Sequence, residues 1–209
     1  MIKALIFDFD GLILDTETPI YRSWVEIYQR FDLSLPFDTW ASIIGTSAAE
    51  HFDPFDQLEQ ALDRKLDRDK LTADRLAVEI SLVTKNAVLP GVEGTIAAAK
   101  TAGLKLAVAS SSTRDWVEGH LDRLALIDNF DTICCAEDVP KTKPDPALFL
   151  LALARLALTP DQALVFEDSP NGVTAANRAG IFSVAIPNDM TRGLSLSHAD
   201  LQLGSLADS

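Results

Sequence analysis

Five short, almost continuous apolar runs recur along the chain, and they restrict the fold more than any other feature. A run of this kind is typical of a strand that is buried on both faces of a parallel sheet. A segment with helical spacing comes before each of the last four runs. Two of these segments are followed by a glycine, Gly103 and Gly180, at which helices commonly end. The predicted strands are residues 2–7, 104–109, 132–135, 163–166 and 181–186, and the predicted helices are residues 92–102, 115–124, 146–156 and 171–179.

This alternation predicts an α/β fold with an open, Rossmann-like parallel sheet and right-handed crossovers. One long stretch interrupts the alternation, because no strand-like run occurs between residues 15 and 87. Helical spacing appears there at residues 21–31, 58–66 and 71–83, and the charged run 63–70 is predicted to be a solvated helix face. We therefore predict a discontinuous catalytic core, residues 1–14 and 88–209, with an inserted all-helical cap domain, residues 15–87.

Composition excludes several classes of protein. The formal net charge of −13 argues against a general nucleic-acid binder, whose affinity would rest on lysine and arginine. The N-terminal apolar run is too short for a secretory signal, and no stretch approaches the ~20 apolar residues of a membrane helix. We expect a cytoplasmic monomer with no membrane partner. The adjacent Cys134 and Cys135 are not expected to form a disulfide, and the three histidines lack zinc-site spacing.

Polar side chains follow four of the predicted strands, at the ends where ligands bind in open α/β sheets. Each group taken alone has a structural explanation as a turn or a helix cap. Their joint occurrence at four strand ends favours a single active site. The residues concerned are Asp8, Asp10, Ser110, Ser111, Lys143, Glu167 and Asp168.

These residue types suit phosphoryl transfer, which needs an in-line nucleophile, a metal and positive donors around the phosphoryl oxygens. The carboxylate of Asp8 can attack phosphorus and form an aspartyl-phosphate. Asp10, two residues later and on the same side of an extended chain, can protonate the leaving oxygen and then activate water. Oxygen ligands from acidic residues suit Mg²⁺, which would also offset the repulsion between an acidic protein and a phosphate.

Four segments resemble the motifs of the haloacid dehalogenase-like hydrolases. They are residues 8–17 (DFDGLILDTE), 108–110 (VAS), 143–146 (KPDP) and 165–172 (VFEDSPNG). The chain is similar in particular to the group with a small helical cap, which includes β-phosphoglucomutases and sugar-phosphate phosphatases. The resemblance extends over the whole chain.

The resemblance implies a role for each matching residue. Asp8 would be the nucleophile and a metal ligand, and Asp10 would be the general acid and base, with its main-chain carbonyl on the metal. The phosphate would be held by Ser110, Ser111 and Lys143, and the Mg²⁺ site would be completed by Glu167 and Asp168. Thr16 and Glu17, where the chain leaves the core, would act at the hinge or contact the substrate at the cap interface.

The leading interpretation is a phosphatase that acts on a small phosphorylated metabolite, with a sugar phosphate as the expected class. The alternative is a β-phosphoglucomutase-like mutase, which in this group carries a basic residue after a cap Gly-x-Ser and a histidine in the first cap helix. Here Ala48 and Ile20 occupy those positions, although Arg22, Lys85 or another cap cation could substitute. Asp10 argues against a dehalogenase, and the complete carboxylate set argues against a non-catalytic binding protein.

Overall fold

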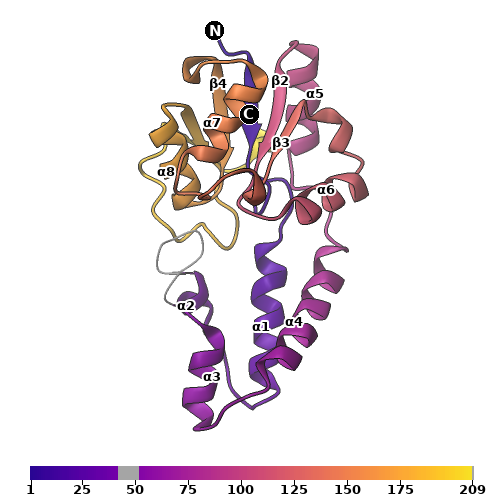
Figure 1. Ribbon diagram of the computed structural model, residues 1–209, viewed down its shortest axis with the longest axis vertical. Helices are drawn as coiled ribbons and strands as arrows, with labels where there is room; N and C mark the ends of the chain where they lie inside the picture. Colours follow the sequence, from indigo (N-terminus) through magenta and orange to yellow (C-terminus); the bar gives the residue numbers. More distant parts are fainter. Residues whose placement is uncertain (42–51, 209) are drawn as a thin grey trace.

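The computed structural model describes residues 1–41 and 52–208, and it shows an α/β fold with a sheet of six parallel strands (Figure 1). The strand order is β3-β2-β1-β4-β5-β6, so the first strand lies between the second and the fourth. The chain moves outward from β1 to β3 and then returns to the other side of β1, which creates a topological switch point there. The strands are β1 (Ala4–Phe7), β2 (Lys105–Ala109), β3 (Thr132–Cys134), β4 (Ala163–Glu167), β5 (Phe182–Ala185) and β6 (Leu201–Gln202).

Helices cover both faces of the sheet, which explains why the strands are continuous apolar runs. In β1, Leu5 and Phe7 join the hydrophobic core on one face, whereas Ala4 and Ile6 join the core on the other. The helices of the first face are α5 (Val92–Thr101) and α6 (Arg114–Arg123), and those of the second are α7 (Ala147–Leu156) and α8 (Pro170–Ala179). The predicted fold class and five strands are confirmed. Sequence reasoning missed β6, which has only two residues, both exposed.

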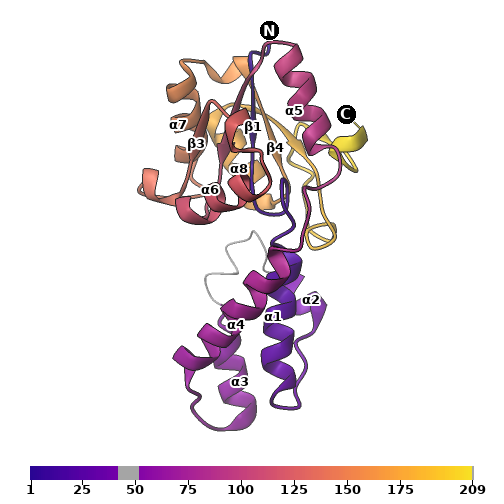
Figure 2. The ribbon, with the colours of Figure 1, turned by 90° about the vertical axis from the view of Figure 1, so that its right-hand side faces the viewer.

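The remaining helices lie together at the carboxyl end of β1 (Figures 1 and 2). Their own hydrophobic core includes Trp24, Ile27 and Leu58, and Met190 from the loop after β5 packs against it. The helices are α1 (Glu17–Gln29), α2 (Phe37–Ala41), α3 (Pro54–Leu62) and α4 (Arg68–Val83). We refer to α1–α4 as the helical unit. The division into a core of residues 1–14 and 88–209 and a cap domain of residues 15–87 stays a prediction.

The predicted helix 58–66 is wrong in its limits, and so is the reading of residues 63–70 as one solvated helix face. Helix α3 begins earlier, because Asp53 caps it by accepting a hydrogen bond from the Phe55 amide and Pro54 occupies its first turn. It ends at Leu62, since Asp63 adopts a left-handed conformation with φ of 49°. The charged run therefore forms the turn into α4 and the first residues of that helix.

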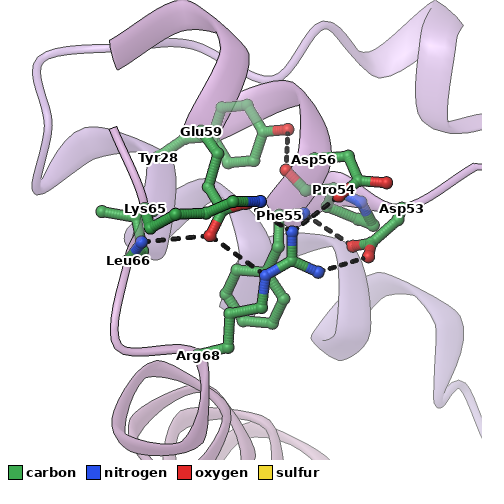
Figure 3. A network of polar contacts seen from close by, with 9 residues as sticks. All are labelled: Tyr28, Asp53, Pro54, Phe55, Asp56, Glu59, Lys65, Leu66 and Arg68. Atoms are coloured by element: carbon green, nitrogen blue, oxygen red, sulfur yellow. Dashed lines mark hydrogen bonds and ion pairs between the residues drawn. The ribbon is translucent and has the colours of Figure 1, made fainter. Parts of the chain in front are cut away.

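A network of ion pairs explains the charges of this turn (Figure 3). The carboxylate of Glu59 on α3 is buried, and it accepts hydrogen bonds from Lys65 Nζ at 2.7 Å and from the Leu66 amide at 3.0 Å. Arg68, the first residue of α4, donates to both oxygens of Glu59 and also to Asp53 and Asp56. The network joins the end of α3 to the start of α4.

We expect Arg68→Gln to lower the melting temperature more than the matched control Arg192→Gln, because Arg192 forms an exposed ion pair with Asp189. Hydrogen bonds from Arg68 and Lys65 hold the pKa of Glu59 well below its usual value of 4.5. The stabilisation is therefore present at neutral pH and is lost as the pH falls below about 4.5. Thermal melts at pH 7 and pH 4 test this, and equal melting temperatures for the two variants at pH 7 would contradict it.

Two further expectations concern the cysteines and membrane-spanning helices. Cys134 and Cys135 are free thiols, both buried, so the expectation that they form no disulfide is confirmed. Within residues 1–41 and 52–208, none of the helices combines the length and the apolar character that a membrane span requires.

Candidate active site

Residues at the carboxyl ends of β1, β2 and β4 and residues of the helical unit line an open cavity of about 500 Å³. Neighbouring parallel strands end at the same edge of the sheet, which is why side chains far apart in sequence meet there. Six of the residues predicted from the sequence line this cavity: Asp8, Asp10, Glu17, Ser111, Lys143 and Asp168. The other three, Thr16, Ser110 and Glu167, are buried and do not line the cavity. Each forms a hydrogen bond with a residue that does: Thr16 and Ser110 with Asp10, and Glu167 with Lys143.

Lys143 lies between two carboxylates. Its Nζ contacts Asp8 Oδ1 and lies 2.6 Å from Glu167 Oε1, and all three side chains are almost inaccessible to solvent. Burial alone would lower the pKa of Lys143, but the charges of Asp8 and Glu167 outweigh burial and raise that pKa above its usual range. Lys143 is therefore a permanent cation beside Asp8, as a phosphate-binding residue must be.

Glu167 is completely buried, and both of its carboxylate oxygens are engaged. Oε1 contacts Lys143, and Oε2 accepts hydrogen bonds at 3.1 Å from the Asp168 amide and from the amide and hydroxyl of Ser169. The first turn of α8 lies against this carboxylate at Gly172, where a Cβ atom would approach the carboxylate to 1.8 Å. Only a glycine at residue 172 therefore leaves room for Glu167 in its observed position.

We expect Gly172→Ala to displace Glu167 and, with it, Lys143. The overpacking should lower the free energy of unfolding by about 1–3 kcal/mol and reduce the hydrolysis of p-nitrophenyl phosphate. The matched control is Gly94→Ala in α5, where an added Cβ meets nothing within 4 Å and should stabilise the helix by up to about 1 kcal/mol. Denaturant unfolding and the same assay compare the two, and a Gly172→Ala protein as stable and active as the control would refute this packing argument.

Asp10 is held by hydrogen bonds to both of its carboxylate oxygens. Oδ1 accepts from the Thr16 hydroxyl and from Trp116 Nε1, each at 2.9 Å. Oδ2 accepts from the hydroxyls of Ser112 at 2.7 Å and Ser110 at 3.1 Å. An indole N–H can only donate, so Trp116 requires an acceptor oxygen on Asp10. The arrangement fixes the position of Asp10 at the cavity wall, and because the three hydroxyl groups can also accept a hydrogen bond, it is compatible with both the ionised and the protonated carboxyl group.

Asp8, Glu167 and Asp168 form a buried carboxylate cluster whose ligand atoms lie within 4.8 Å of one another. Burial raises the pKa of Asp8 to about 8, because the nearby Glu167 and Asp10 reinforce burial and Lys143 only partly opposes it. Burial and the charges of Glu167 and Asp8 likewise raise the pKa of Asp168. A cluster of like charges with one lysine is suited to a bound dication, and a set of carboxylate oxygens fits Mg²⁺.

Comparison with known proteins agrees with this geometry. Residues 5–186 match the family described as haloacid dehalogenase-like hydrolase. The chain belongs to the haloacid dehalogenase-like hydrolases. It is 45% identical to YhcW of Bacillus subtilis, whose name assigns it to the phosphatases, with 100% of this chain and 94% of YhcW covered. The family assignment and the predicted enzyme class, a hydrolase of the phosphatase type, are confirmed.

Other relatives in this family include both phosphatases and a mutase. A phosphorylated carbohydrates phosphatase of Thermotoga maritima is 32% identical, with 86% of this chain and 82% of the relative covered. The β-phosphoglucomutase of Bacillus subtilis is 30% identical, with 99% and 91% covered. The crystal structure of CbbY from Rhodobacter sphaeroides in complex with phosphate superposes with a TM-score of 0.74 at 27% identity, and covers 100% of this chain and 96% of that one.

Sequence reasoning missed Asn188, which connects two parts of this hydrolase site. Its Nδ2 donates to the Gly11 carbonyl at 2.9 Å and to Asp168 Oδ2 at 2.8 Å. Gly11 has a φ of +78°, and a Cβ atom there would approach Asp168 Oδ2 to 2.4 Å. Asn188 follows β5, so extending the search from four strand ends to the fifth would have found it.

Ser112, Trp116 and Glu79 also line the cavity without having been assigned to the site. Ser112 belongs to the serine run after the second strand, which was a usable signal. Trp116 lies in the first turn of α6, and Glu79 comes from α4 in the helical unit. The sequence offered no signal for either, because their contacts depend on how helices pack.

The helical unit adds Glu17 and Ile20 from α1 to the cavity wall, besides Glu79. The half-buried carboxylate of Glu17 accepts no hydrogen bond from any of the described residues. Burial, with the nearby charges of Asp10, Asp15 and Glu79, raises the pKa of Glu17 to about 7.

Two of the cap cations that could serve a mutase do not reach the cavity. Arg22 and Lys85 are exposed, and neither lines the cavity. The other position considered for a mutase cation, Ala48 after Gly45, Thr46 and Ser47, lies outside the described residues. Among the residues that the structure describes, Lys143 is the one cation in the cavity wall.

Proposed function

We propose that this protein is a Mg²⁺-dependent phosphatase that hydrolyses a small phosphorylated metabolite, a sugar phosphate, through an aspartyl-phosphate on Asp8. The observation that carries the proposal is the position of Asp8: its carboxylate contacts Lys143, belongs to the buried cluster with Asp168, and faces the same cavity as Asp10. Side chains suited to the roles of nucleophile, phosphate-binding cation, metal ligand and acid thus face one cavity, which supports phosphoryl transfer.

In this proposal Asp8 attacks phosphorus, and the bond between phosphorus and the leaving oxygen breaks. Asp10 gives a proton to that oxygen and later takes one from the water that hydrolyses the aspartyl-phosphate. Ser111 and Lys143 line the cavity, so we assign the phosphoryl oxygens to them. Ser110 was also predicted to bind phosphate, but its hydroxyl donates to Asp10, so we assign Ser110 to positioning Asp10.

The residues that would hold Mg²⁺ are Asp8, Asp168 and the main-chain carbonyl of Asp10. Glu167 belongs to the same cluster, but its two oxygens already accept hydrogen bonds. We therefore assign Glu167 to holding Lys143 and orienting the segment that carries Asp168. When bound, Mg²⁺ would offset the charges of the carboxylates and of the substrate phosphate.

The composition of the cavity wall supports a phosphatase rather than a mutase. A mutase must retain its bisphosphate intermediate while that intermediate reorients in the active site. This requirement favours a cation that binds the distal phosphate. The described part of the helical unit contributes Glu17, Ile20 and Glu79 to the wall, and none of these is a cation. Without such a contact, which contributes roughly 1.5–3 kcal/mol, water should reach the aspartyl-phosphate and hydrolysis should dominate.

We expect the enzyme to release inorganic phosphate from β-glucose 1-phosphate without a bisphosphate activator. The measurement follows phosphate release and conversion to glucose 6-phosphate in parallel, with and without glucose 1,6-bisphosphate. Release should exceed conversion in both conditions, because the described residues of the helical unit place no cation in the cavity wall to retain the bisphosphate. Dominant conversion that the bisphosphate stimulates would instead support the β-phosphoglucomutase alternative, which the 30% identical relative makes the second candidate.

A further inference from the structure

The helical unit carries an arginine that contacts a residue of the cavity wall but does not itself line the cavity. Arg75 lies on α4 one helical turn before Glu79, and its Nη1 contacts the Glu79 carboxylate. The same guanidinium donates to the Ser23 hydroxyl at 3.3 Å and lies 5.2 Å from the centre of the Trp24 ring. Its side chain is 14% exposed and does not line the cavity, whereas Glu79 does.

Glu79 is thus the charged residue that α4 contributes to the cavity wall, and it contacts an arginine that does not line that wall. We propose that Glu79 determines specificity: by holding Arg75 against α1, it keeps a cation out of the cavity and selects monophosphates whose leaving group is uncharged and rich in hydroxyls. This inference rests on the proposed function, because it concerns the substrate class of the same site.

The chemistry of the wall supports this class of substrate. The carboxylate of Glu17 has no donor among the described residues, so it is available to accept hydrogen bonds from substrate hydroxyls. A second phosphate group at that position would face Glu17 and Glu79, two carboxylates, and the described part of the helical unit offers it no cation in the cavity wall. Repulsion between like charges is strong in a partly dehydrated site. The two carboxylates should therefore disfavour binding of a bisphosphate relative to a monophosphate.

The matched ligands glucose 6-phosphate and glucose 1,6-bisphosphate test the inference, since they differ only in the second phosphate. Binding is measured by calorimetry in Mg²⁺ buffer on the Asp8→Asn protein, so that no turnover is needed. Adding Glu79→Gln should release Arg75 and shift the ratio of the two Kd values toward the bisphosphate by about tenfold. The double change Arg75→Gln and Glu79→Gln should remove that shift, and Glu26→Gln, an exposed charge on α1, should cause none.

An unchanged Kd ratio in a folded Glu79→Gln protein overturns the inference. A shift in the Kd ratio that persists in the double variant also overturns it, because Arg75 would then not be the cause of the shift. Tighter binding of the bisphosphate than of the monophosphate before any change at Glu79 also overturns it, as does failure of both ligands to bind. Thermal melts verify that each variant is folded. Phosphate release from p-nitrophenyl phosphate by the unmodified enzyme tests the proposed function separately, so the two failures are distinguishable.

Discussion

The Asp8→Asn protein should release no phosphate above background while remaining folded. An amide is not a nucleophile toward phosphorus, so the covalent step is lost, and the expected fall in kcat is on the order of 10⁴-fold or more. The fold should survive because the amide is nearly isosteric and Lys143 retains its contact with Glu167 at 2.6 Å. The measurement is p-nitrophenyl phosphate hydrolysis together with a thermal melt.

The matched control for this change is Asp189→Asn, because Asp189 is an exposed aspartate whose ion-pair partner among the described residues is Arg192. It removes the same charge and should leave kcat unchanged. Mass spectrometry of the Asp8→Asn protein verifies that the asparagine has not reverted to aspartate by deamidation. Turnover by a verified, folded Asp8→Asn protein at a rate near that of the control would rule out Asp8 as the nucleophile.

Removal of divalent metal should produce the second large loss of activity. The carboxylates of Asp8, Glu167 and Asp168 are balanced by one lysine, so without a dication they and the incoming phosphate repel one another. Because metal catalysis of this kind contributes several kcal/mol, we expect excess chelator to reduce kcat by about 100-fold or more. Mg²⁺ should restore the rate. Ca²⁺ should inhibit, since its larger and looser coordination shell would misplace Asp8.

Metal binding can also be read without turnover. Mg²⁺ should raise the melting temperature of the unmodified protein, because a ligand that binds only the folded state stabilises it. Asp168→Asn should reduce that rise, whereas Asp161→Asn, at the other end of β4, should not. Undiminished hydrolysis in excess chelator, or an equal effect of Mg²⁺ on both variants, would contradict the assigned metal site.

The strands could be predicted because of where they lie in the sheet. Residues 4–7 pack alternately into two hydrophobic cores, so every position is apolar and the run is visible without knowing the fold. Among the described strands, Leu201–Gln202 lies at the sheet edge beside β5 and is exposed, so it carries no such signal. The limits of α3 depended on the conformation of Asp63, which local periodicity does not report.

The residues of the candidate site could be predicted where they follow the end of a strand. Asp8, Asp168 and Lys143 meet because they follow strands or loops at one edge of a parallel sheet. The contacts of Trp116 with Asp10 and of Glu79 with Arg75 depend on how α6 and α4 pack, and a sequence pattern does not contain that information. The hydrogen bond from the Ser110 hydroxyl to Asp10 was likewise not visible in the sequence, and the phosphate-binding role predicted for Ser110 stays a prediction.

Trapping the covalent intermediate tests the central claim most directly. The enzyme is mixed with p-nitrophenyl phosphate and Mg²⁺, quenched during turnover, reduced with borohydride and digested, and the peptide that contains residue 8 is analysed by mass spectrometry. Borohydride converts an aspartyl-phosphate to homoserine, so we predict homoserine at position 8, and none when substrate is omitted. Active turnover with an unmodified Asp8, or with homoserine at another aspartate, would contradict an aspartyl-phosphate mechanism at Asp8.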